Sequence, residues 1–327
     1  LRGQGTGIIT QMPPVGPPYA ERVDGDPNAL GMDAIIQWIR TVEVEAIPKR
    51  PDCLEASPGL SPLRRLTRAE YGYAIQDIFG VDPEVTENFP AETEAFGFDN
   101  NADYAAVNLL LAEQYFDVAD DVARSAVSDL PALLGRLDVN CQPRQPDCVR
   151  QLLEATAYRA YRRPLSEEEK AEVMEVYQRL LEAQIDRSNA LQTAIASILQ
   201  SPHFLYRLEG DHRDENPGSI EPVTGFEMAS RLSFFIWASI PDTGLLNAAA
   251  QGELDTAEGV AAMANEMLDD PKARRIISRF YQQWMGLNDL ESITKNAQVY
   301  PTWNQSLAHG LVDETLSVIE HLTFESD

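Results

Sequence analysis

Apolar residues recur at helical spacing along most of this chain. In the segments 67–79, 166–181 and 224–236 they stand three or four positions apart, which is the period of one face of an α-helix. Alternation of apolar and polar residues with period two, the pattern of a half-buried strand, is nearly absent. The pattern predicts an all-α protein of about ten helices.

The predicted helices begin at capping sequences. The pattern Ser/Thr-x-x-Glu occurs at Thr67–Glu70, Ser166–Glu169 and Thr224–Glu227, and Asp255–Glu258 is a variant of it. In such a capping box each of the two side chains accepts a hydrogen bond from the backbone at the other residue. Gly80 follows the first apolar stripe, and we expect it to end that helix because glycine readily adopts the left-handed conformation.

Proline-rich and polar stretches divide the chain into blocks. We expect an N-terminal piece at 1–45, a linker at 46–62, helical domains at 63–137, 138–208 and 223–327, and a second linker at 209–222. The sequence opens on Leu1 and stops inside the helical pattern of the last domain. We therefore expect a piece of a longer polypeptide, with the third domain incomplete at its C-terminal end.

The net charge of the chain excludes some classes of binding partner. The formal net charge is −26 and the isoelectric point is near 4.4. Such a surface repels phosphate backbones and anionic lipids, so we expect neither nucleic acid nor an anionic membrane as a partner. No apolar run approaches the roughly 18 residues of a membrane-spanning helix. The acidic residues either confer solubility alone or attract cations and basic partners.

Two of the three cysteines flank a short loop. Cys141 and Cys148 enclose the proline-broken stretch QPRQPD. A disulfide there would stabilise the fold by about 2–3 kcal/mol and would indicate an oxidising compartment. Free thiols are the alternative, and a zinc site would need two further soft ligands that the nearby sequence lacks. Cys53 is left over, and a cysteine upstream of Leu1 could be its partner.

Catalytic patterns that can be seen in sequence are absent. The four histidines form no H-E-x-x-H or H-x-H pattern, and neither a G-x-S-x-G elbow nor a P-loop occurs. His203 is expected in a core or a cap rather than as a ligand. Whether the protein is an enzyme stays open.

One loop carries oxygen-bearing side chains at a density suited to calcium. Asp99, Asn100, Asn101 and Asp103 fall within five positions of the stretch FGFDNNADY, and calcium takes six to eight oxygen ligands. The EF-hand order is not met, because the glycine and the glutamate of that loop have no counterpart here. The alternative is that these residues turn the chain and cap the next helix.

Arginines cluster at 64–68, 159–163 and 274–279. In so acidic a chain we expect them to form bidentate ion pairs with carboxylates between the helical blocks, with an anion or substrate site as the alternative. Aromatic residues at helical spacing are expected in the core of the third block: Phe234, Phe235, Trp237, Phe280, Tyr281 and Trp284.

Long stretches of the sequence resemble one family in its domain order. LRRLTRAEYGYAIQDIFGVD and FPAETEAFGFDNNAD resemble the first domain of the planctomycete-type secreted proteins of unknown function, which are often fused to cytochrome c modules. AYRAYRRPLSEEE and AIASILQSPHFLYRLE resemble their second domain. MASRLSFFIWASIPDTGLLNAAAQGEL and DDPKARRIISRFYQQWMGLNDL resemble their central domain. The resemblance spans residues 61–327 and implies an exported protein, periplasmic or extracellular, with Cys141 paired to Cys148; it implies no established reaction.

The opening stretch fits the same resemblance. TQMPP, which contains Met12, precedes an apolar helical segment at Met32–Val42. Planctomycete-type cytochrome c modules end in such a loop and closing helix, so the resemblance implies a cytochrome c-like remnant at the N-terminus. Met12 would then be an axial ligand of a haem c, with the histidine and the attaching cysteines upstream of Leu1. A proline-rich tether without haem is the alternative.

Three functions are compatible with these patterns. The first is electron transfer through a haem c near Met12, with the helical domains docking protein partners of the envelope such as a basic electron carrier. The second is a non-enzymatic envelope scaffold or binding protein. The third is a secreted enzyme that acts on a polymer through a site assembled from distant residues.

Overall fold

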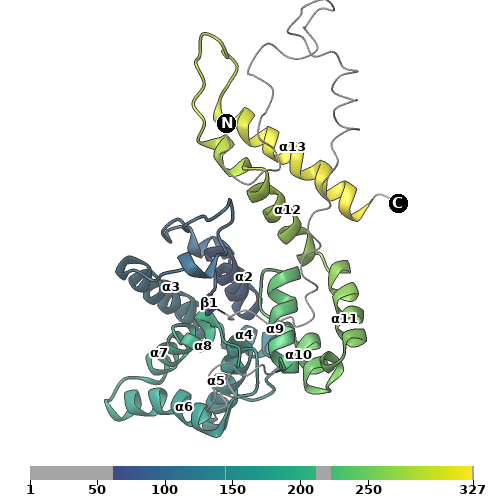
Figure 1. The fold of residues 1–327 in the computed structure, drawn as a ribbon. Helices are drawn as coiled ribbons and strands as arrows, with labels where there is room; N and C mark the ends of the chain where they lie inside the picture. The colour runs from purple at the N-terminus through teal and green to yellow at the C-terminus, as the bar shows by residue number, and fades with distance from the viewer. Residues whose placement is uncertain (1–61, 144, 211–221, 326–327) are drawn as a thin grey trace, which may run out of the picture. The chain divides into compact units, whose positions relative to one another are not determined.

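The computed structural model describes residues 62–143, 145–210 and 222–325. Met12, Cys53 and the predicted N-terminal piece lie outside these ranges. The elements in chain order (Figure 1) are β1 (Arg64–Arg65), α2 (Arg68–Phe79), η2 (Pro83–Thr86), η3 (Ala102–Tyr104), α3 (Leu109–Ser128), α4 (Leu130–Arg136), α5 (Pro146–Tyr161), α6 (Glu167–Glu182), α7 (Arg187–Leu199), α8 (Pro202–Leu205), β2 (Tyr206–Arg207), α9 (Gly225–Ile236), α10 (Thr243–Ala250), η4 (Glu253–Asp255), α11 (Ala257–Asp269), α12 (Lys272–Trp284), η5 (Leu287–Glu291) and α13 (Gln305–Phe324).

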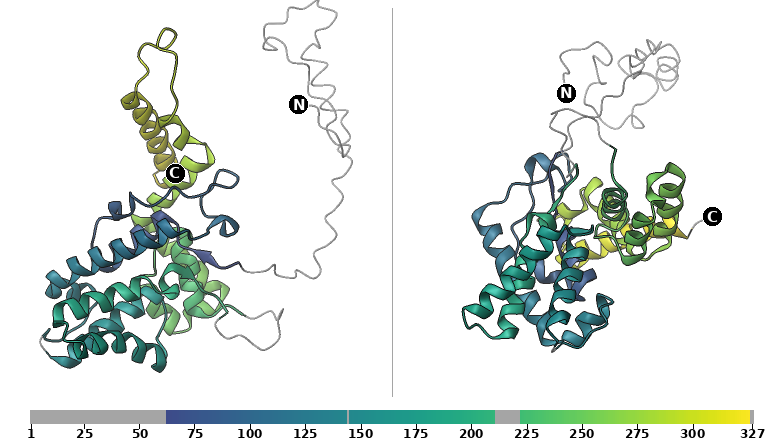
Figure 2. Two further views of the ribbon diagram at one scale, coloured as in Figure 1. Left: turned by 90° about the vertical axis from the view of Figure 1, so that its left-hand side faces the viewer. Right: turned by 90° about the horizontal axis from the view of Figure 1, so that it is seen from below.

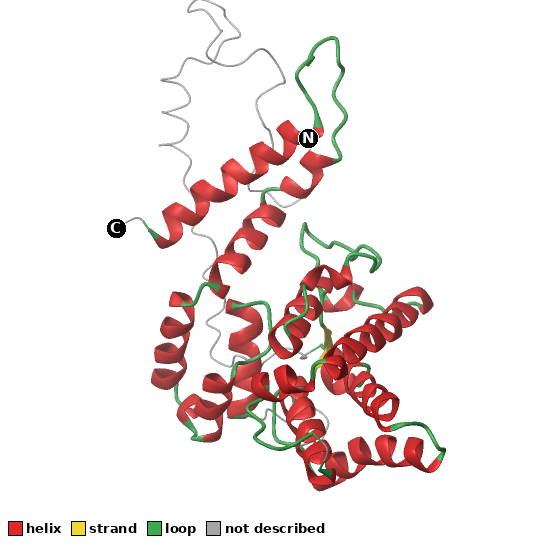
Figure 3. Cartoon of the chain, turned by 180° about the vertical axis from the view of Figure 1, so that it is seen from behind, coloured by secondary structure: helices red, strands yellow, loops and turns green. Residues whose placement is uncertain are grey.

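This architecture confirms the all-α prediction. In the described ranges the only strands are β1 and β2, of two residues each, which pair antiparallel with Arg64 opposite Arg207 (Figure 3). The strand pair joins the start of the first block to the end of the second. No helix in the same ranges is both long and apolar enough to cross a membrane.

Most of the predicted helix ends are correct. The capping boxes of α2, α6 and α9 are formed, each with both of its hydrogen bonds. Gly80 ends α2 in the left-handed conformation, with a φ of 70°. The fourth start is wrong by one residue, because Thr256 and not Asp255 caps α11. Thr256 has the extended backbone of an N-cap, and its hydroxyl accepts a hydrogen bond from the Gly259 N–H.

Helix α7 lies inside the larger hydrophobic core. It packs against α3, α5, α6 and α8, and Figure 2 shows the blue and teal helices of this part of the chain lying side by side. Alanines at 190, 194 and 196 are buried in α7 and allow its neighbours to approach closely, while Ile195 and Leu199 fill the remaining space. The same core includes Leu66 and Tyr71 of the first block. The first and second predicted blocks therefore share one core.

The third block has a smaller core of its own. Trp237, Leu245 and Met267 are buried between α9, α10 and α11. Phe234 and Ile240, from the same block, belong instead to the larger core. Buried apolar side chains therefore attach the third block to the first two.

Arg162 links the ends of three elements. It follows the last residue of α5 with a φ of 63°, and only 4% of its surface is exposed. Its guanidinium donates hydrogen bonds at 2.6–3.2 Å to the carbonyls of Ala160, His203, Phe204 and Tyr206. One side chain thus holds the end of α5 against α8 and β2.

The partners of Arg162 correct the expectation of a carboxylate pair. Within the described ranges no carboxylate forms an ion pair with it, and the four carbonyl dipoles take that place. Burial lowers the pKa of Arg162, and the nearby Arg207 and Arg163 lower it further. The guanidinium stays charged at neutral pH because its ordinary pKa is so high. Its planar fork of five donors suits several fixed acceptors better than a lysine ammonium would.

Other arginines of the predicted clusters do meet carboxylates. The ion pairs are Arg65–Glu92, Arg163–Glu169, Arg274–Glu325, Arg275–Asp77 and Arg279–Asp99. The last two connect the third block to the first, as the sequence predicts, but each is a single contact and not the expected bidentate pair. The others lie within a single block.

The expectation that the aromatic residues of the third block are core residues is wrong for three of them. Phe235 is 79% exposed, Phe280 45% and Trp284 63%. Phe235 follows the buried Phe234 and so points about 100° away around α9. Phe280 and Trp284 stand seven and eleven residues after the buried Ala273 and so share its face of α12; that face is buried at the start of the helix and exposed toward its end.

The structure joins Cys141 to Cys148 by a disulfide, with the two Cα atoms 5.4 Å apart. Cys148 lies in the first turn of α5 and is buried against the larger core. The bond therefore fixes the loop before α5 to the start of that helix. This pairing agrees with the one that the sequence favours.

Replacing Arg162 by methionine should lower the free energy of unfolding by about 4 kcal/mol, because four buried carbonyls lose their donor together. Urea denaturation followed by circular dichroism measures this loss. Arg179→Met is the matched control: that side chain is 74% exposed and pairs only with Glu175 on its own helix, so a change below about 0.5 kcal/mol is expected. Equal effects of the two substitutions would contradict the role given to Arg162.

Candidate functional site

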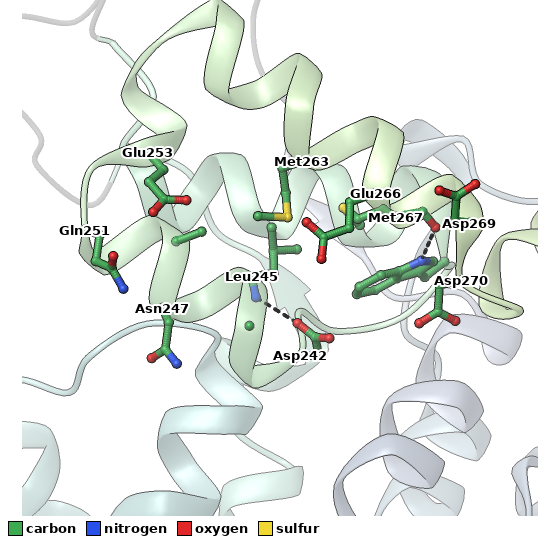
Figure 4. Close-up of a pocket in the computed structure, with 13 residues that line it drawn as sticks. Asp242, Leu245, Asn247, Gln251, Glu253, Met263, Glu266, Met267, Asp269 and Asp270 are labelled. Carbon is green, nitrogen blue, oxygen red and sulfur yellow. Dashed lines mark hydrogen bonds between the residues drawn. The ribbon is translucent and has the colours of Figure 1, made fainter.

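The third block contains an open pocket of about 450 Å³ between α9, α10 and α11 (Figure 4). Its lining consists of Trp237, Asp242, Gly244, Leu245, Asn247, Ala248, Gln251, Glu253, Met263, Glu266, Met267, Asp269 and Asp270. The volume falls in the range of small-ligand pockets, or of a pocket that accepts one side chain of a protein partner.

Local hydrogen bonds fix the walls of this pocket. Asp242 caps α10, since its carboxylate accepts a hydrogen bond from the Leu245 N–H at 2.8 Å. The Trp237 indole N–H donates to the Met267 carbonyl at 3.0 Å, so the ring is held against the end of α11. Both contacts are drawn in Figure 4. The rigid parts are thus the indole ring and the start of α10.

The lining carries charge of one sign. Five of its residues are Asp or Glu, and none is Lys, Arg or His. Figure 4 shows Glu253 and Gln251 at one end of the pocket and Asp269 and Asp270 at the other. Met263 and Met267 add polarisable sulfur beside the indole ring. Carboxylates around an aromatic and sulfur-lined surface suit a cationic group.

The indole ring already contacts one cation of the chain itself. The Lys272 ammonium lies 5.0 Å from the centre of the Trp237 ring, a distance at which the ring face attracts a positive charge. The same ammonium donates to Asp77 at 3.1 Å. Lys272 therefore connects the border of the pocket to α2 of the first block.

Among the described residues, the donors that reach Asp77 from the third block contact its Oδ2 atom. The Ser239 hydroxyl donates to it at 2.7 Å, and an Arg275 nitrogen lies at 3.7 Å. Arg275 also donates from Nε to the Trp237 carbonyl at 2.7 Å and covers the Tyr73 ring at 4.1 Å. Burial lowers the pKa of Arg275, and Asp77 opposes that shift. Asp77, Ser239, Lys272 and Arg275 thus form a junction between the first and third blocks, beside the pocket. One carboxylate and three donor side chains hold it.

The second block reaches the same junction through Arg159. Its guanidinium donates to the Thr243 hydroxyl at 3.0 Å, at the start of α10. Burial lowers the pKa of Arg159, while Asp242 and Asp77 oppose the shift. Side chains of all three blocks therefore meet near the start of α10, which lines the pocket.

The residues predicted as calcium ligands lie away from this pocket. Asp99 pairs with Arg279, and Asn101 caps η3 by accepting a hydrogen bond from the Asp103 N–H at 3.0 Å. In the described part of the chain no three His, Cys, Asp or Glu side chains come together as a metal site. Calcium at Asp99, Asn100, Asn101 and Asp103 stays a prediction.

His203 lies in a separate polar cluster of the second block. Its ring is 5.0 Å from the Tyr161 ring and its Nε2 is 3.6 Å from Glu169. Arg163 binds the same carboxylate through two hydrogen bonds, and this contact lowers the pKa of Glu169. The cluster fixes the start of α6 to α8, which is a structural role.

Sequence patterns did not single out the pocket. Asp242 and Trp237 stand in the stretch WASIPD with no recognisable spacing to Glu266 or Asp270. One available signal was Asp242, three positions before Leu245 in an N-cap pattern. The pocket forms only because α9, α10 and α11 fold back on one another.

Comparison with protein families found three matches in consecutive parts of the chain. Residues 64–128 match the family PSD3, described as protein of unknown function (DUF1587). Residues 148–209 match the family PSD5, described as protein of unknown function (DUF1595). Residues 223–327 match PSD4, a protein of unknown function (DUF1592). This chain combines three domains of unknown function. Comparison with curated proteins and with solved structures found no match.

These matches assign the junction to all three domains. Asp77 lies in the PSD3 region, Arg159 in the PSD5 region and Lys272 in the PSD4 region. The pocket lies entirely in the PSD4 region. The contacts around Asp77 therefore couple the PSD4 pocket to the other two domains.

Asp77→Asn should destabilise the fold by about 2 kcal/mol, because the charge-assisted hydrogen bond from Lys272 is weakened and the ion pair with Arg275 is lost. Asp117→Asn, an exposed carboxylate on α3, is the control and should change stability by less than about 0.5 kcal/mol. Guanidinium denaturation followed by tryptophan fluorescence measures both. An unchanged midpoint for Asp77→Asn would show that the junction does not depend on this carboxylate.

Proposed function

We propose that this chain is the docking part of an exported electron-transfer protein. In this proposal a c-type haem attached upstream of Leu1 exchanges electrons with a basic carrier, and the helical domains bind that carrier. The acidic pocket beside Trp237 is the observation that supports the docking role, because it offers five carboxylates and no base. The stretch TQMPP supports the haem.

In this proposal the residues that would hold the haem lie outside the described ranges. The haem supplies one-electron chemistry at an iron whose potential depends on its axial ligands and its burial. Met12 would be one ligand, and a histidine upstream of Leu1 the other. Two described histidines have other contacts: His203 lies against Glu169, and His321 pairs with Glu325 on α13. In this proposal the described residues act in docking, and haem ligation falls to Met12 and residues upstream of Leu1.

The charge distribution suits a basic partner. With a net charge of −26, the chain attracts a positively charged protein over about one Debye length, roughly 10 Å at 0.1 M salt. The pocket then offers a lysine or arginine side chain of that partner an aromatic surface and several carboxylates. Long-range attraction speeds the encounter, and the pocket fixes the orientation.

A second candidate is a non-enzymatic binding protein of the cell envelope. The exposed aromatic side chains of α12 favour it, because monomeric proteins rarely leave such groups in solvent without a partner. Export is part of both proposals, and the Cys141–Cys148 disulfide supports it. The polymer-acting enzyme stays a prediction, because no observation on the described residues assigns a reaction.

A visible spectrum of the native full-length protein tests the first proposal. The reduced-minus-oxidised difference, repeated in pyridine, should show one c-type haem per chain. Met12→Ala should shift the midpoint potential, because it removes an axial sulfur ligand. Met32→Ala is the control and should leave the potential unchanged.

A spectrum without a haem signal would overturn electron transfer by this protein. A haem signal with no effect of Met12→Ala would remove Met12 from the ligand set. In the first case the envelope binding protein becomes the better account.

A further inference from the structure

The turn at 95–98 lies against the end of α12, where Phe98 stacks on Phe280. We group the apolar side chains at this place and name them the Phe96 surface: Phe96, Phe98, Phe280, Trp284 and Met285. The Phe98 and Phe280 rings lie 5.7 Å apart at 24°, and the Phe280 and Trp284 rings 6.0 Å apart at 21°. Phe96 is 95% exposed, Trp284 63% and Met285 51%. The surface is contributed by the PSD3 and PSD4 regions together.

Phe96 stands at the tip of a tight turn that disfavours it. Ala95 and Phe98 exchange backbone hydrogen bonds at 2.8 and 3.1 Å, so two residues make the turn. Phe96 has a φ of 56° and Gly97 a φ of 84°, and such turns normally take Asn, Asp or Gly at both positions. A bulky side chain in the left-handed region is strained. Strain and full exposure together show that Phe96 does not serve the stability of the turn.

The turn is nevertheless held in place. Asp99 pairs with Arg279 of α12, and the two side chains are only 11% and 28% exposed. A Cβ added at Gly97 would lie 3.7 Å from the Gln283 carbonyl, which shows that the turn touches the helix. Phe96 is therefore presented from a fixed base, so a partner that binds it loses little conformational freedom.

Exposed carboxylates flank the turn that carries Phe96. From residue 69 to residue 123 the sequence has Asp and Glu but no Lys, Arg or His, and Arg279 on the α12 side is paired with Asp99. Glu94 and Asp103, on either side of the turn, are exposed and form no ion pair within the described ranges. A second copy of the chain would bring carboxylates against carboxylates, and an anionic membrane would be repelled. A positively charged partner complements these carboxylates.

We propose that the Phe96 surface is a docking site for a basic protein, which receives the Phe96 ring in an apolar pocket surrounded by lysine or arginine residues. An aromatic anchor inside a polar rim is the usual arrangement of a protein-binding hot spot. The site depends neither on the haem nor on the pocket beside Trp237, so it fails or holds independently of the electron-transfer proposal; the envelope binding protein rests on the same aromatic side chains of α12.

The test compares Phe96→Asn with the unmodified full-length chain. Asparagine suits the left-handed conformation, so the melting temperature should stay the same or rise. The probe is an amphipathic peptide of lysine and leucine, titrated by calorimetry. Its affinity should fall about tenfold or more with Phe96→Asn, in line with the loss of a hot-spot aromatic side chain. Trp284→Ser should weaken binding in the same direction.

Three controls make the outcome decisive. Phe116→Ser removes a side chain that is 58% exposed on α3 and outside the surface, and it should leave the affinity unchanged. A lysine–serine peptide lacks the apolar contact and a glutamate–leucine peptide lacks the charge, so both should bind at least tenfold more weakly. Equal loss with Phe96→Asn and Phe116→Ser, or equal binding of the glutamate–leucine peptide, would overturn the proposal.

Discussion

The packing of the chain depends on one buried guanidinium. Arg162 stands where α5 ends, and its four hydrogen bonds to backbone carbonyls fix α8 and β2 against that helix. β2 then pairs with β1, which leads directly into α2. The guanidinium also lies over the Phe234 ring, 5.6 Å from its centre, and Arg207 lies over the same ring at 5.1 Å. A single cation thus connects the second block to the first through the strands and to the third through an aromatic ring.

The junction around Asp77 depends on this packing. Asp77, Arg159 and Lys272 come from three separate family regions, and each is held in place by the helix that carries it. The junction borders the acidic pocket, while the Phe96 surface lies at the other end of α12. Both candidate binding regions therefore involve the third block, and both have positions fixed by ion pairs with the first. This arrangement suits a protein that presents a rigid binding face rather than one that closes around a substrate.

The sequence predicted what depends on local spacing. The apolar stripes, the capping boxes and Gly80 follow from neighbours within four residues, and the structure has them. It did not predict that Arg162 binds carbonyls, because its acceptors at His203, Phe204 and Tyr206 lie about forty positions away and carry no side-chain signal. Nor did it predict the exposure of Phe280 and Trp284, because spacing shows that they share a helix face with the buried Ala273 and not how far along α12 that face is covered. The pocket beside Trp237 was missed for the same reason, since its carboxylates come together only when three helices pack.

The most direct test of the central claim is the rate at which the reduced native protein transfers electrons to a basic c-type cytochrome, measured by stopped flow at increasing salt concentration. Acidic docking predicts a rate constant that falls steeply with ionic strength. It also predicts a slower reaction at low salt when Glu266 and Asp269 in the pocket are replaced by Gln and Asn. A rate constant that is independent of salt and unaffected by these substitutions would contradict acidic docking as the function of this chain.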